Sequence, residues 1–355
     1  MKILLTGICG FAGTAITHSL LERIEGLTVA GIDNLLRPGS ETNRSKLRRA
    51  GVNLIHGDLR MASDFETLPE ADWVIDAAAN PSILAGLQQG FTSRQLFEHN
   101  LAGLVNVLEY CKTYKSGLVL LSSSRVYSVP ALISLPLKVR ANAFHLDDSQ
   151  TLPCGVSPRG IDSDFSTKPP VSLYGGMKLA SEVVALEYGE AFGFPVWINR
   201  SGVLAGAGQF GTPDQGIFSY WINAHLRKRT LRYVGFDGTG KQVRDVLHPR
   251  DLATLLELQI CSSRTGGQRI YTAGGGVSRS ISLAELNAWC DARFGAHAAE
   301  SDLRPRPYDV PWLVMDSHDC GRDFGWSPQT SIEAILDEIA IHAQDHPDWL
   351  ERSGL

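Results

Sequence analysis

Three things are scarce in this sequence of 355 residues: cysteine, an excess of positive charge, and long hydrophobic runs. The six cysteines lack the spacing of a metal site or a disulfide framework, so we expect reduced thiols in a cytoplasmic protein. A net charge of -5 argues against a nucleic-acid-binding protein. No apolar run approaches the roughly 20 residues that span a bilayer, and a strand begins at Lys2, so we expect neither a membrane span nor a signal peptide.

What remains is ordinary for a globular protein, with 43% hydrophobic and 20% charged residues. The length allows one large domain, or a domain with a smaller lobe, around a sizeable core. No internal repeat and no low-complexity segment interrupts the chain.

The stretch Tyr174-Gly175-Gly176-Met177-Lys178 places a tyrosine and a lysine one helical turn apart on the same face. A lysine ammonium beside a phenol favours the phenolate, so such a tyrosine can act as a general base or acid on a sugar hydroxyl. By itself the pair is a weak signal, because an exposed helical pair of this kind is usually a solvated face. The interpretation depends on the rest of the chain.

A glycine-rich turn near the N-terminus supplies the first supporting feature. The buried strand Lys2 to Thr6 runs into Gly7, Gly10 and Gly13, and an amphipathic helix follows to about Ile24. Strand, glycine turn and helix form a cradle for a pyrophosphate, in which the glycines permit the tight turn, the approach of the ligand and the packing of helix on strand. The spacing G-x-x-G-x-x-G differs from the usual G-x-G-x-x-G, and the triplet gains weight only from this context.

A second strand ends at Asp33, where an acidic side chain accepts hydrogen bonds from the adenosine ribose. A carboxylate there repels a 2′-phosphate, so NAD is favoured over NADP, although Arg37 lies close enough to blur the choice. The alternative for Asp33 is a turn residue at a strand end. The small residues Ala77, Ala78 and Ala79 would let the backbone pass close to the cofactor.

The alternation of strands and helices predicts an α/β fold of the Rossmann type, with a doubly wound parallel sheet and a smaller C-terminal substrate lobe. We expect residues 1–200 to form the NAD-binding domain, with segments near 243–272 returning to it, and residues 201–242 and 273–355 to form the lobe. The irregular stretch 128–171 is too long for an ordinary connection and is interpreted as a lid over the substrate. Further strands are predicted over 27–32, 52–56, 72–79, 117–121 and 194–199, and helices over 93–114, 174–192, 216–227, 249–261, 282–294 and 331–343.

Two more features stand out before any family is considered. Asn100 is the one polar member of the apolar stripe on the helix at 93–114, and it is either a cofactor contact or a satisfied core amide. The run Ser122-Ser123-Ser124-Arg125 follows a predicted strand at its carboxyl end, where open α/β sheets place their chemistry.

The chain resembles the extended short-chain dehydrogenase/reductases that act on nucleotide sugars. The features that carry this resemblance occur in the order of that family: the glycine triplet, Asp33, the serine run, and Tyr174 with Lys178. The resemblance extends over about residues 1 to 345. Within that family the chain is most similar to the CDP-tyvelose 2-epimerases (CDP-paratose 2-epimerases). The stretches that carry this similarity are 33–43, 56–60, 122–127, 209–216 and 240–248, of which the last two discriminate best.

The resemblance implies roles for particular residues. Tyr174 is similar to the catalytic tyrosine and Lys178 to its lysine, and the active-site Ser or Thr stands four places before the tyrosine of the Val-Tyr pair, which gives Ser123. Tightly bound NAD is implied as the cofactor, with its remaining contacts at Cys9, Phe11, Ala12, Asn34, Arg37, Asp58, Leu59, Asn100, Ser122, Arg200 and Val203. A nucleotide-diphosphate sugar is implied as the substrate, with its contacts at Ser124, Arg125, Ser201, Gln209, Gln215, Arg244 and Arg306.

Arginine suits the diphosphate because a guanidinium pairs with phosphate through two parallel hydrogen bonds. An ordinary surface ion pair is the alternative for Arg306, and less so for Arg244. The chain departs from the family pattern at Ser128, at Asp76 and in the long stretch 128–171. Dehydratases carry Asp-Glu where this chain has Ser124-Arg125, which argues against water elimination.

The implied reaction is inversion of a sugar carbon through a transient ketosugar, with C2 of a CDP-deoxysugar as the specific expectation. A C4 epimerase or a reductase of another nucleotide sugar is the alternative at the same site. A catalytically silent NAD-binding regulator is the alternative of another class, and the intact Ser123, Tyr174 and Lys178 argue against it. The family commonly dimerises through the tyrosine helix and the helix before it, so a homodimer is expected. No metal site is predicted.

Overall fold

The computed structural model describes residues 1–84, 86–87, 92–264 and 266–355. At its centre is a parallel sheet of seven strands in the order β14-β10-β5-β4-β1-β2-β3, in which the chain reverses direction across the sheet next to β1. This is the doubly wound sheet that the sequence predicts. The strands are β1 (Lys2–Thr6), β2 (Thr28–Asp33), β3 (Asn53–His56), β4 (Trp73–Asp76), β5 (Gly117–Ser123), β10 (Val196–Ser201) and β14 (Ile270–Ala273).

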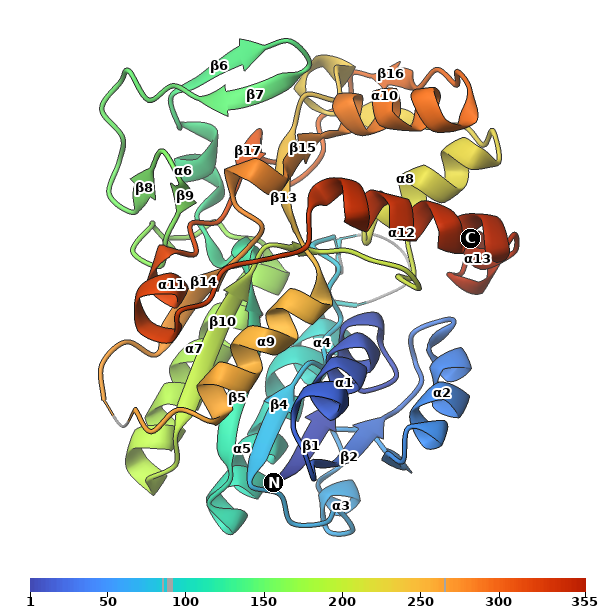
Figure 1. Cartoon of the computed structure of the whole chain (residues 1–355). Coiled ribbons are helices and arrows are strands. Elements are labelled where there is room, and N and C mark those ends of the chain that lie inside the picture. Colours follow the sequence, from blue (N-terminus) through green and yellow to red (C-terminus); the bar gives the residue numbers. More distant parts are fainter. Residues whose placement is uncertain (85, 88–91, 265) are drawn as a thin grey trace.

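Helices cover both faces of the sheet, so the inner strands are apolar on both sides (Figure 1). On one face lie α1 (Phe11–Arg23), α9 (Pro249–Ile260) and α11 (His318–Phe324). On the other face lie α5 (Gly103–Tyr114) and α7 (Leu173–Phe192). The shorter helices of this part are α2 (Arg44–Arg49), α3 (Ala62–Phe65), α4 (Ser93–Phe97) and the 3-10 turn η1 (Ser40–Asn43).

The helix predicted over 93–114 is present with one irregularity. Between α4 and α5 the chain makes a π-helical turn, η2 (Glu98–Ala102), which is the one wide turn in an otherwise α-helical run. Wide turns of this kind often occur at functional sites, because they redirect one side chain without ending the helix. Here the redirected residue is the buried Asn100.

A second part of the chain lies over the carboxyl ends of the sheet strands, in the upper half of Figure 1. Its core is formed by the helices and a small sheet in which β13 pairs with β11, β15 and β17. The helices are α8 (Ile217–Leu226), α10 (Leu283–Phe294), α12 (Ile332–Asp345) and α13 (Trp349–Arg352). The strands and 3-10 turns are β11 (Val203–Leu204), β12 (Arg232–Val234), η4 (Phe236–Gly238), β13 (Val243–Leu247), η5 (Val277–Arg279), β15 (Ser280–Ser282), β16 (Glu300–Asp302) and β17 (Trp312–Leu313).

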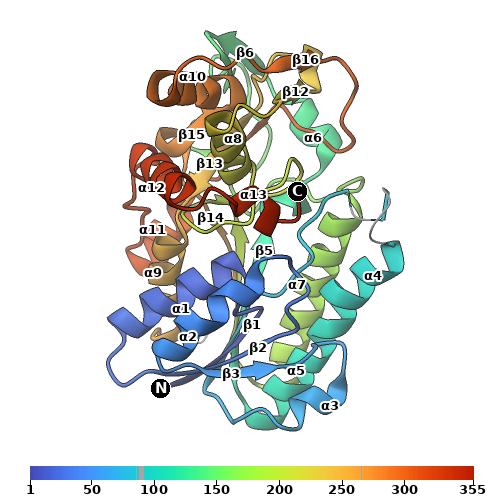
Figure 2. The same ribbon diagram turned by 90° about the vertical axis from the view of Figure 1, so that its right-hand side faces the viewer.

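The long stretch 128–171 is folded rather than irregular. It holds α6 (Val129–Ile133) and the hairpins β6 (Leu137–Arg140) with β7 (Ala143–Leu146) and β8 (Val156–Ser157) with β9 (Gly160–Ile161). These elements pack with β17 and the residues after it in a hydrophobic cluster of their own. Figure 2 shows β6 and α6 at the end of the molecule that lies away from the large sheet.

Among the residues that the structure describes, no helix is long and apolar enough to cross a membrane. Most predicted elements agree with the structure to within a few residues. The sequence pattern did not predict β14 and α11 as separate elements. β14 forms one edge of the large sheet, and α11 packs on one of its faces.

Candidate active site

A deep cleft opens where the carboxyl ends of the sheet strands face the second part of the chain. Its volume is about 1040 Å³, at the upper end of the range for small-molecule sites. Ligands of open α/β sheets bind at this edge, beside the point where the strand order reverses. The glycine turn, the serine run, Tyr174 and Lys178 all line this one cleft, so residues far apart in sequence are brought to one place.

The turn between β1 and α1 forms one wall. Gly7 has a φ of 63°, and a Cβ added there would lie 2.8 Å from the Cα of Ala78. A Cβ on Gly13 would lie 2.4 Å from the carbonyl oxygen of Gly7. Gly10 is the N-cap of α1 and supplies no side-chain cap, so the first N–H groups of the helix remain available to an anion. The described turn therefore fits the pyrophosphate of a dinucleotide.

Asp33 ends β2 beside this turn. Its carboxylate accepts hydrogen bonds from the backbone N–H groups of Cys9 and Leu35, each at 2.8 Å. Burial raises the pKa of Asp33 above its usual value, and these backbone hydrogen bonds oppose that rise. Cys9 takes part only through its backbone, since its thiol is buried and does not line the cleft. Burial raises the pKa of that thiol to about 12, so it is not a nucleophile.

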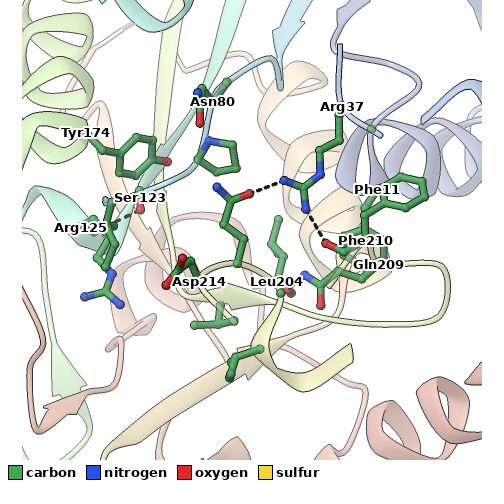
Figure 3. A pocket seen from close by; sticks show the side chains of 18 of the residues that line it. Phe11, Arg37, Asn80, Ser123, Arg125, Tyr174, Leu204, Gln209, Phe210 and Asp214 are labelled. Carbon is green, nitrogen blue, oxygen red and sulfur yellow. Dashed lines mark hydrogen bonds between the residues drawn. The ribbon is translucent and has the colours of Figure 1, made fainter. Parts of the chain in front are cut away.

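Arg37 extends from the loop after β2 across the cleft. Its guanidinium donates to the side-chain oxygen of Gln215 at 2.6 Å and to the carbonyl oxygen of Phe210 at 2.7 Å (Figure 3). Both partners belong to the second part of the chain. Arg37 is thus already engaged as a bridge between the two sides of the cleft, rather than held free for a 2′-phosphate.

Next along this wall, Asp58 accepts hydrogen bonds from Arg60 and from Asn34. The hydrogen bond from Arg60 holds the pKa of Asp58 well below its usual value. Other residues that we predicted as cofactor contacts also line the cleft: Phe11, Ala12, Leu59, Ala77, Ala78, Ala79, Ser122 and Val203.

Asn100 does not line the cleft. Its side-chain amide donates to the carbonyl oxygen of Asn80 at 3.0 Å and accepts from the backbone N–H of Asn80 at 2.7 Å. Asn80 itself lines the cleft just after β4. Asn100 is therefore a satisfied core amide that holds this wall in place, which is the alternative that the sequence left open.

The predicted catalytic residues lie together. Ser123 ends β5, and its hydroxyl oxygen accepts from the backbone N–H of Arg125 at 3.1 Å. Tyr174 lies in the first turn of α7, whose N-cap Ser172 accepts from the backbone N–H of Gly175. Figure 3 shows the ends of the Tyr174 and Ser123 side chains on the same side of the cavity.

The side chain of Lys178 is held by a hydrogen bond to β5. Lys178 is 3% exposed, and its ammonium donates to the carbonyl oxygen of Leu121 on β5 at 2.9 Å. Asp76, where the sequence departs from the family pattern, is buried at the end of β4 and accepts from the hydroxyl of Thr6. Burial raises the pKa of Asp76, and the nearby charge of Lys178 opposes that rise. Asp76 does not line the cleft.

Arg200 and Ser201 also lie outside the cleft lining, contrary to their predicted roles as cofactor and substrate contacts. Arg200 points into the core and pairs with Glu182 at 2.7 Å. Ser201 is buried on β10, and its hydroxyl has no hydrogen-bond partner within the described ranges. Both predictions were wrong, because Glu182 holds Arg200 in the core and the side chain of Ser201 is buried within the sheet region.

The predicted substrate residues Ser124, Arg125, Gln209, Gln215, Arg244 and Arg306 line the cleft. Arg244 pairs with Asp309 at 3.2 Å, and Arg306 pairs with Asp214 at 3.1 Å. Gln209 donates to the carbonyl oxygen of Leu204 at 2.6 Å.

The sequence did not single out Asp309 and Asp214, which hold these two arginines. In the sequence, only Asp309, three places after Arg306, indicates an acidic partner for these arginines.

No residue of the fully described stretch 128–171 lines the cleft. The lid interpretation was therefore wrong. The stretch instead buries its apolar side chains against β17, and the hydroxyl of Tyr127 donates to the carbonyl oxygen of Asp162 within it. Among the described residues, no group of three or more His, Cys, Asp or Glu side chains is placed to hold a metal ion.

The comparisons with known proteins agree with this geometry. A family model described as the NAD dependent epimerase/dehydratase family matches residues 3–274. The chain belongs to this family. It is therefore an NAD-dependent enzyme.

Two relatives show the range within the family. The chain is 28% identical to CDP-paratose 2-epimerase of Salmonella typhi over 345 residues, which cover 93% of this chain and 96% of the relative. It is 24% identical to UDP-glucuronate 4-epimerase 2 of Arabidopsis thaliana over 359 residues, covering 95% and 74%. Among solved structures, the UDP-glucuronic acid 4-epimerase of Bacillus cereus shares the fold, with a TM-score of 0.78, 23% identity, and 97% and 99% coverage.

Proposed function

We propose that this enzyme inverts one carbon of a nucleotide-diphosphate sugar through a transient ketosugar and retains its NAD between turnovers. The observation that carries the proposal is that Ser123, Tyr174 and Lys178 line the same cleft as the glycine turn. An acid–base group for a sugar hydroxyl and a dinucleotide cradle in one cavity suit hydride chemistry at a sugar carbon.

The residues divide the work as follows. Tyr174 takes the proton of the sugar hydroxyl as the ketone forms, and returns it when the hydroxyl is restored. Ser123 donates a hydrogen bond to the same oxygen, and Lys178 contributes a positive charge behind the phenol. NAD, when bound, supplies the hydride acceptor and donor. Because the ketosugar presents its other face before reduction, the centre is inverted and no net redox change results.

Arg244 and Arg306 are proposed to bind the diphosphate. Each lines the cleft and is held by an acidic side chain that fixes its direction. Fixed guanidinium groups bind phosphate oxygens without a large loss of side-chain entropy on binding.

Two candidates remain for the sugar and its carbon. C2 of a CDP-deoxysugar is supported by the relative from Salmonella typhi and by the stretches 209–216 and 240–248. C4 of another nucleotide sugar is supported by the relatives named as UDP-glucuronate 4-epimerases and by the arginine at position 125, which is developed below. A reductase would need external NADH or NADPH, and an epimerase would not.

The test is replacement of Tyr174 by Phe, which removes one oxygen and keeps the ring. We expect turnover to fall by about 10² to 10⁴, because general acid–base catalysis contributes on that order. The amount of NAD released on denaturation should stay unchanged. Inversion is measured in heavy water, where hydride return from the cofactor leaves no deuterium on the sugar carbon.

The matched control is Tyr188→Phe on the same helix. Its hydroxyl bonds to Glu109 at 2.9 Å and does not line the cleft, so this variant should keep its turnover. Undiminished turnover in Tyr174→Phe would overturn the assignment. Loss of turnover in both variants would point to damage to α7 instead.

For the whole molecule we propose a cytoplasmic homodimer, with residues 1–200 and the segments near 243–272 as the NAD-binding domain. Phe97 on α4 and Val183 on α7 support a paired surface, since they are large apolar side chains that are 47% and 60% exposed. Sedimentation velocity distinguishes one chain from two, and a monomer at micromolar concentration would exclude the dimer.

A further inference from the structure

Arginines are unusually frequent around the cleft, and all but one already have an acceptor. Arg37 donates to Gln215, and Arg60 donates to Asp58. Every other arginine of the lining except Arg125 also donates to an acceptor. Arg125 has neither a hydrogen-bond acceptor nor an acidic partner for its guanidinium among the residues that the structure describes. The seven lining arginines are Arg37, Arg60, Arg125, Arg232, Arg244, Arg304 and Arg306.

Arg125 is held firmly by its backbone. Its N–H donates to the hydroxyl of Ser123, and its carbonyl oxygen packs against Gly175 on α7, the residue after Tyr174. It belongs to the short 3-10 turn η3 (Ser124–Val126) that follows β5 directly. The residue is therefore fixed between the strand that carries Ser123 and the helix that carries Tyr174.

The side chain extends from this point along the cleft. Figure 3 shows Arg125 on the side of Tyr174 and Ser123, across the cavity from Arg37. Arg37 marks the end where the loop after Asp33 lies, so Arg125 lies toward the end where the sugar reacts.

The surroundings of Arg125 are short of negative charge. Burial, together with the neighbouring cations Arg244 and Arg306, lowers its pKa to about 9, against the opposing charge of Asp309. Asp309 is already occupied, since it accepts from Arg244 at 3.2 Å and from Gln242 at 3.1 Å. A partly buried cation without a counterion is unfavourable, so this position favours an anionic ligand group.

We propose that Arg125 binds a carboxylate carried by the sugar ring, so that the natural substrate is a nucleotide-linked acidic sugar. This inference rests on the proposed function. The diphosphate is assigned to Arg244 and Arg306, which leaves the arginine next to Ser123 for the sugar itself. A carboxylate matches a guanidinium through two parallel hydrogen bonds, which a neutral hydroxymethyl group does not provide. A CDP-deoxysugar brings no anion beyond its diphosphate, so the inference favours the second candidate above.

The experiment measures binding, so that it does not depend on turnover. The NAD-loaded protein is titrated in a calorimeter with UDP-glucuronic acid, UDP-glucose and UDP alone. The first two ligands differ only in a carboxylate against a hydroxymethyl group. We expect the wild-type protein to bind the acidic sugar at least about tenfold more tightly than the neutral one.

The variant Arg125→Gln should lose this preference. Binding of UDP-glucuronic acid should weaken about 10- to 100-fold, as expected for a lost hydrogen bond to a charged group, while binding of UDP-glucose and UDP changes less than threefold. The control is Arg304→Gln, because Arg304 also lines the cleft but has a 79% exposed side chain that is paired with Asp302. This variant should keep the wild-type preference.

The outcomes distinguish a failure of the carboxylate assignment from a failure of the proposed function. Equal affinity of the wild-type protein for UDP-glucuronic acid and UDP-glucose would overturn the proposal that Arg125 binds a carboxylate. It would leave the epimerase proposal standing. Equal weakening of all three ligands in Arg125→Gln would make Arg125 a diphosphate ligand and also overturn the inference. Failure of all three ligands to bind the wild-type protein, while CDP binds, would favour the CDP-deoxysugar over the acidic sugar, and failure of CDP as well would overturn the proposed function itself.

Discussion

The ion pair between Glu182 and Arg200 joins β10 to α7 and β5, the two elements that carry the candidate catalytic residues. Glu182 lies on α7 one turn after Lys178, and Arg200 lies on β10. Three hydrogen bonds from the Arg200 guanidinium reach Glu182, at 2.7, 3.1 and 3.2 Å, and Ser122 on β5 donates to the same carboxylate. The pair therefore sets the position of α7 against β5, and with it that of Tyr174 against Ser123.

The magnitude follows from burial. The two side chains are only 2% and 6% exposed, so neither charge is solvated if its partner is lost. Burial alone would lower the pKa of Arg200, but the hydrogen bonds and charge of Glu182 outweigh it and raise that pKa above its usual value. Replacing Glu182 removes this rise, yet Arg200 stays charged, because a guanidinium is not deprotonated in proteins. Breaking a buried pair in this way costs about 3–5 kcal/mol of stability.

We therefore predict that Glu182→Gln lowers the free energy of unfolding by about 3–5 kcal/mol, measured by urea denaturation with an unchanged slope. The double variant Glu182→Gln with Arg200→Met should lose less than Glu182→Gln alone, because it no longer buries an uncompensated cation. The control is Asp348→Asn, which breaks an exposed pair on the C-terminal helix and should leave the free energy of unfolding nearly unchanged.

Two results would refute this reasoning. A loss in Glu182→Gln no larger than in the exposed control would mean that water reaches the pair. A double variant less stable than the single one would mean that Arg200 stabilises the fold without Glu182, through its hydrogen bond to the carbonyl oxygen of Ser163 at 3.0 Å.

Two further predictions concern single carboxylates. Asp33→Asn should reduce the preference for NAD over NADP by at least about tenfold in cofactor titrations, since hydrogen bonds from the ribose to a charged group are lost, and an unchanged preference would contradict the role of Asp33. Burial raises the pKa of Asp245 to about 7, so its ionised form is disfavoured in the folded chain. Because this pKa is raised, its contribution to stability is full below the unfolded pKa of about 4 and is lost as pH rises through 7. Unfolding free energies should therefore fall between pH 5 and pH 8 by more in the wild-type protein than in Asp245→Asn, and parallel profiles would exclude this explanation.

Local chemistry explains what could be predicted from the sequence. The turn from Gly7 to Gly13 is specified in large part locally, since a side chain at Gly13 would collide with the backbone of Gly7 and Ile8. The helix of Tyr174 and Lys178 is equally local, because it begins at the Ser172 cap and its periodicity is visible. Such features depend on short-range sterics, which the order of residues states directly.

Long-range contacts explain what could not be predicted. The stretch 128–171 is rich in turn residues, and only its packing against β17 shows that it forms hairpins rather than a lid. Arg200 was expected at the cofactor from the family resemblance, yet the carboxylate of Glu182, 18 residues earlier, draws it into the core. Arg37 was expected to bear on the choice of cofactor, and its partners Phe210 and Gln215 lie more than 170 residues away.

The bridge made by Arg37 suggests how the two halves of the cleft act together. Its loop follows Asp33 on the dinucleotide side, whereas its acceptors lie in the stretch 209–216 on the substrate side. Arg37 therefore connects the wall that holds Asp33 to the stretch on the substrate side by two hydrogen bonds. Side chains that are held in this way lose less entropy when a ligand binds. The bridge therefore favours binding on both sides of the cleft.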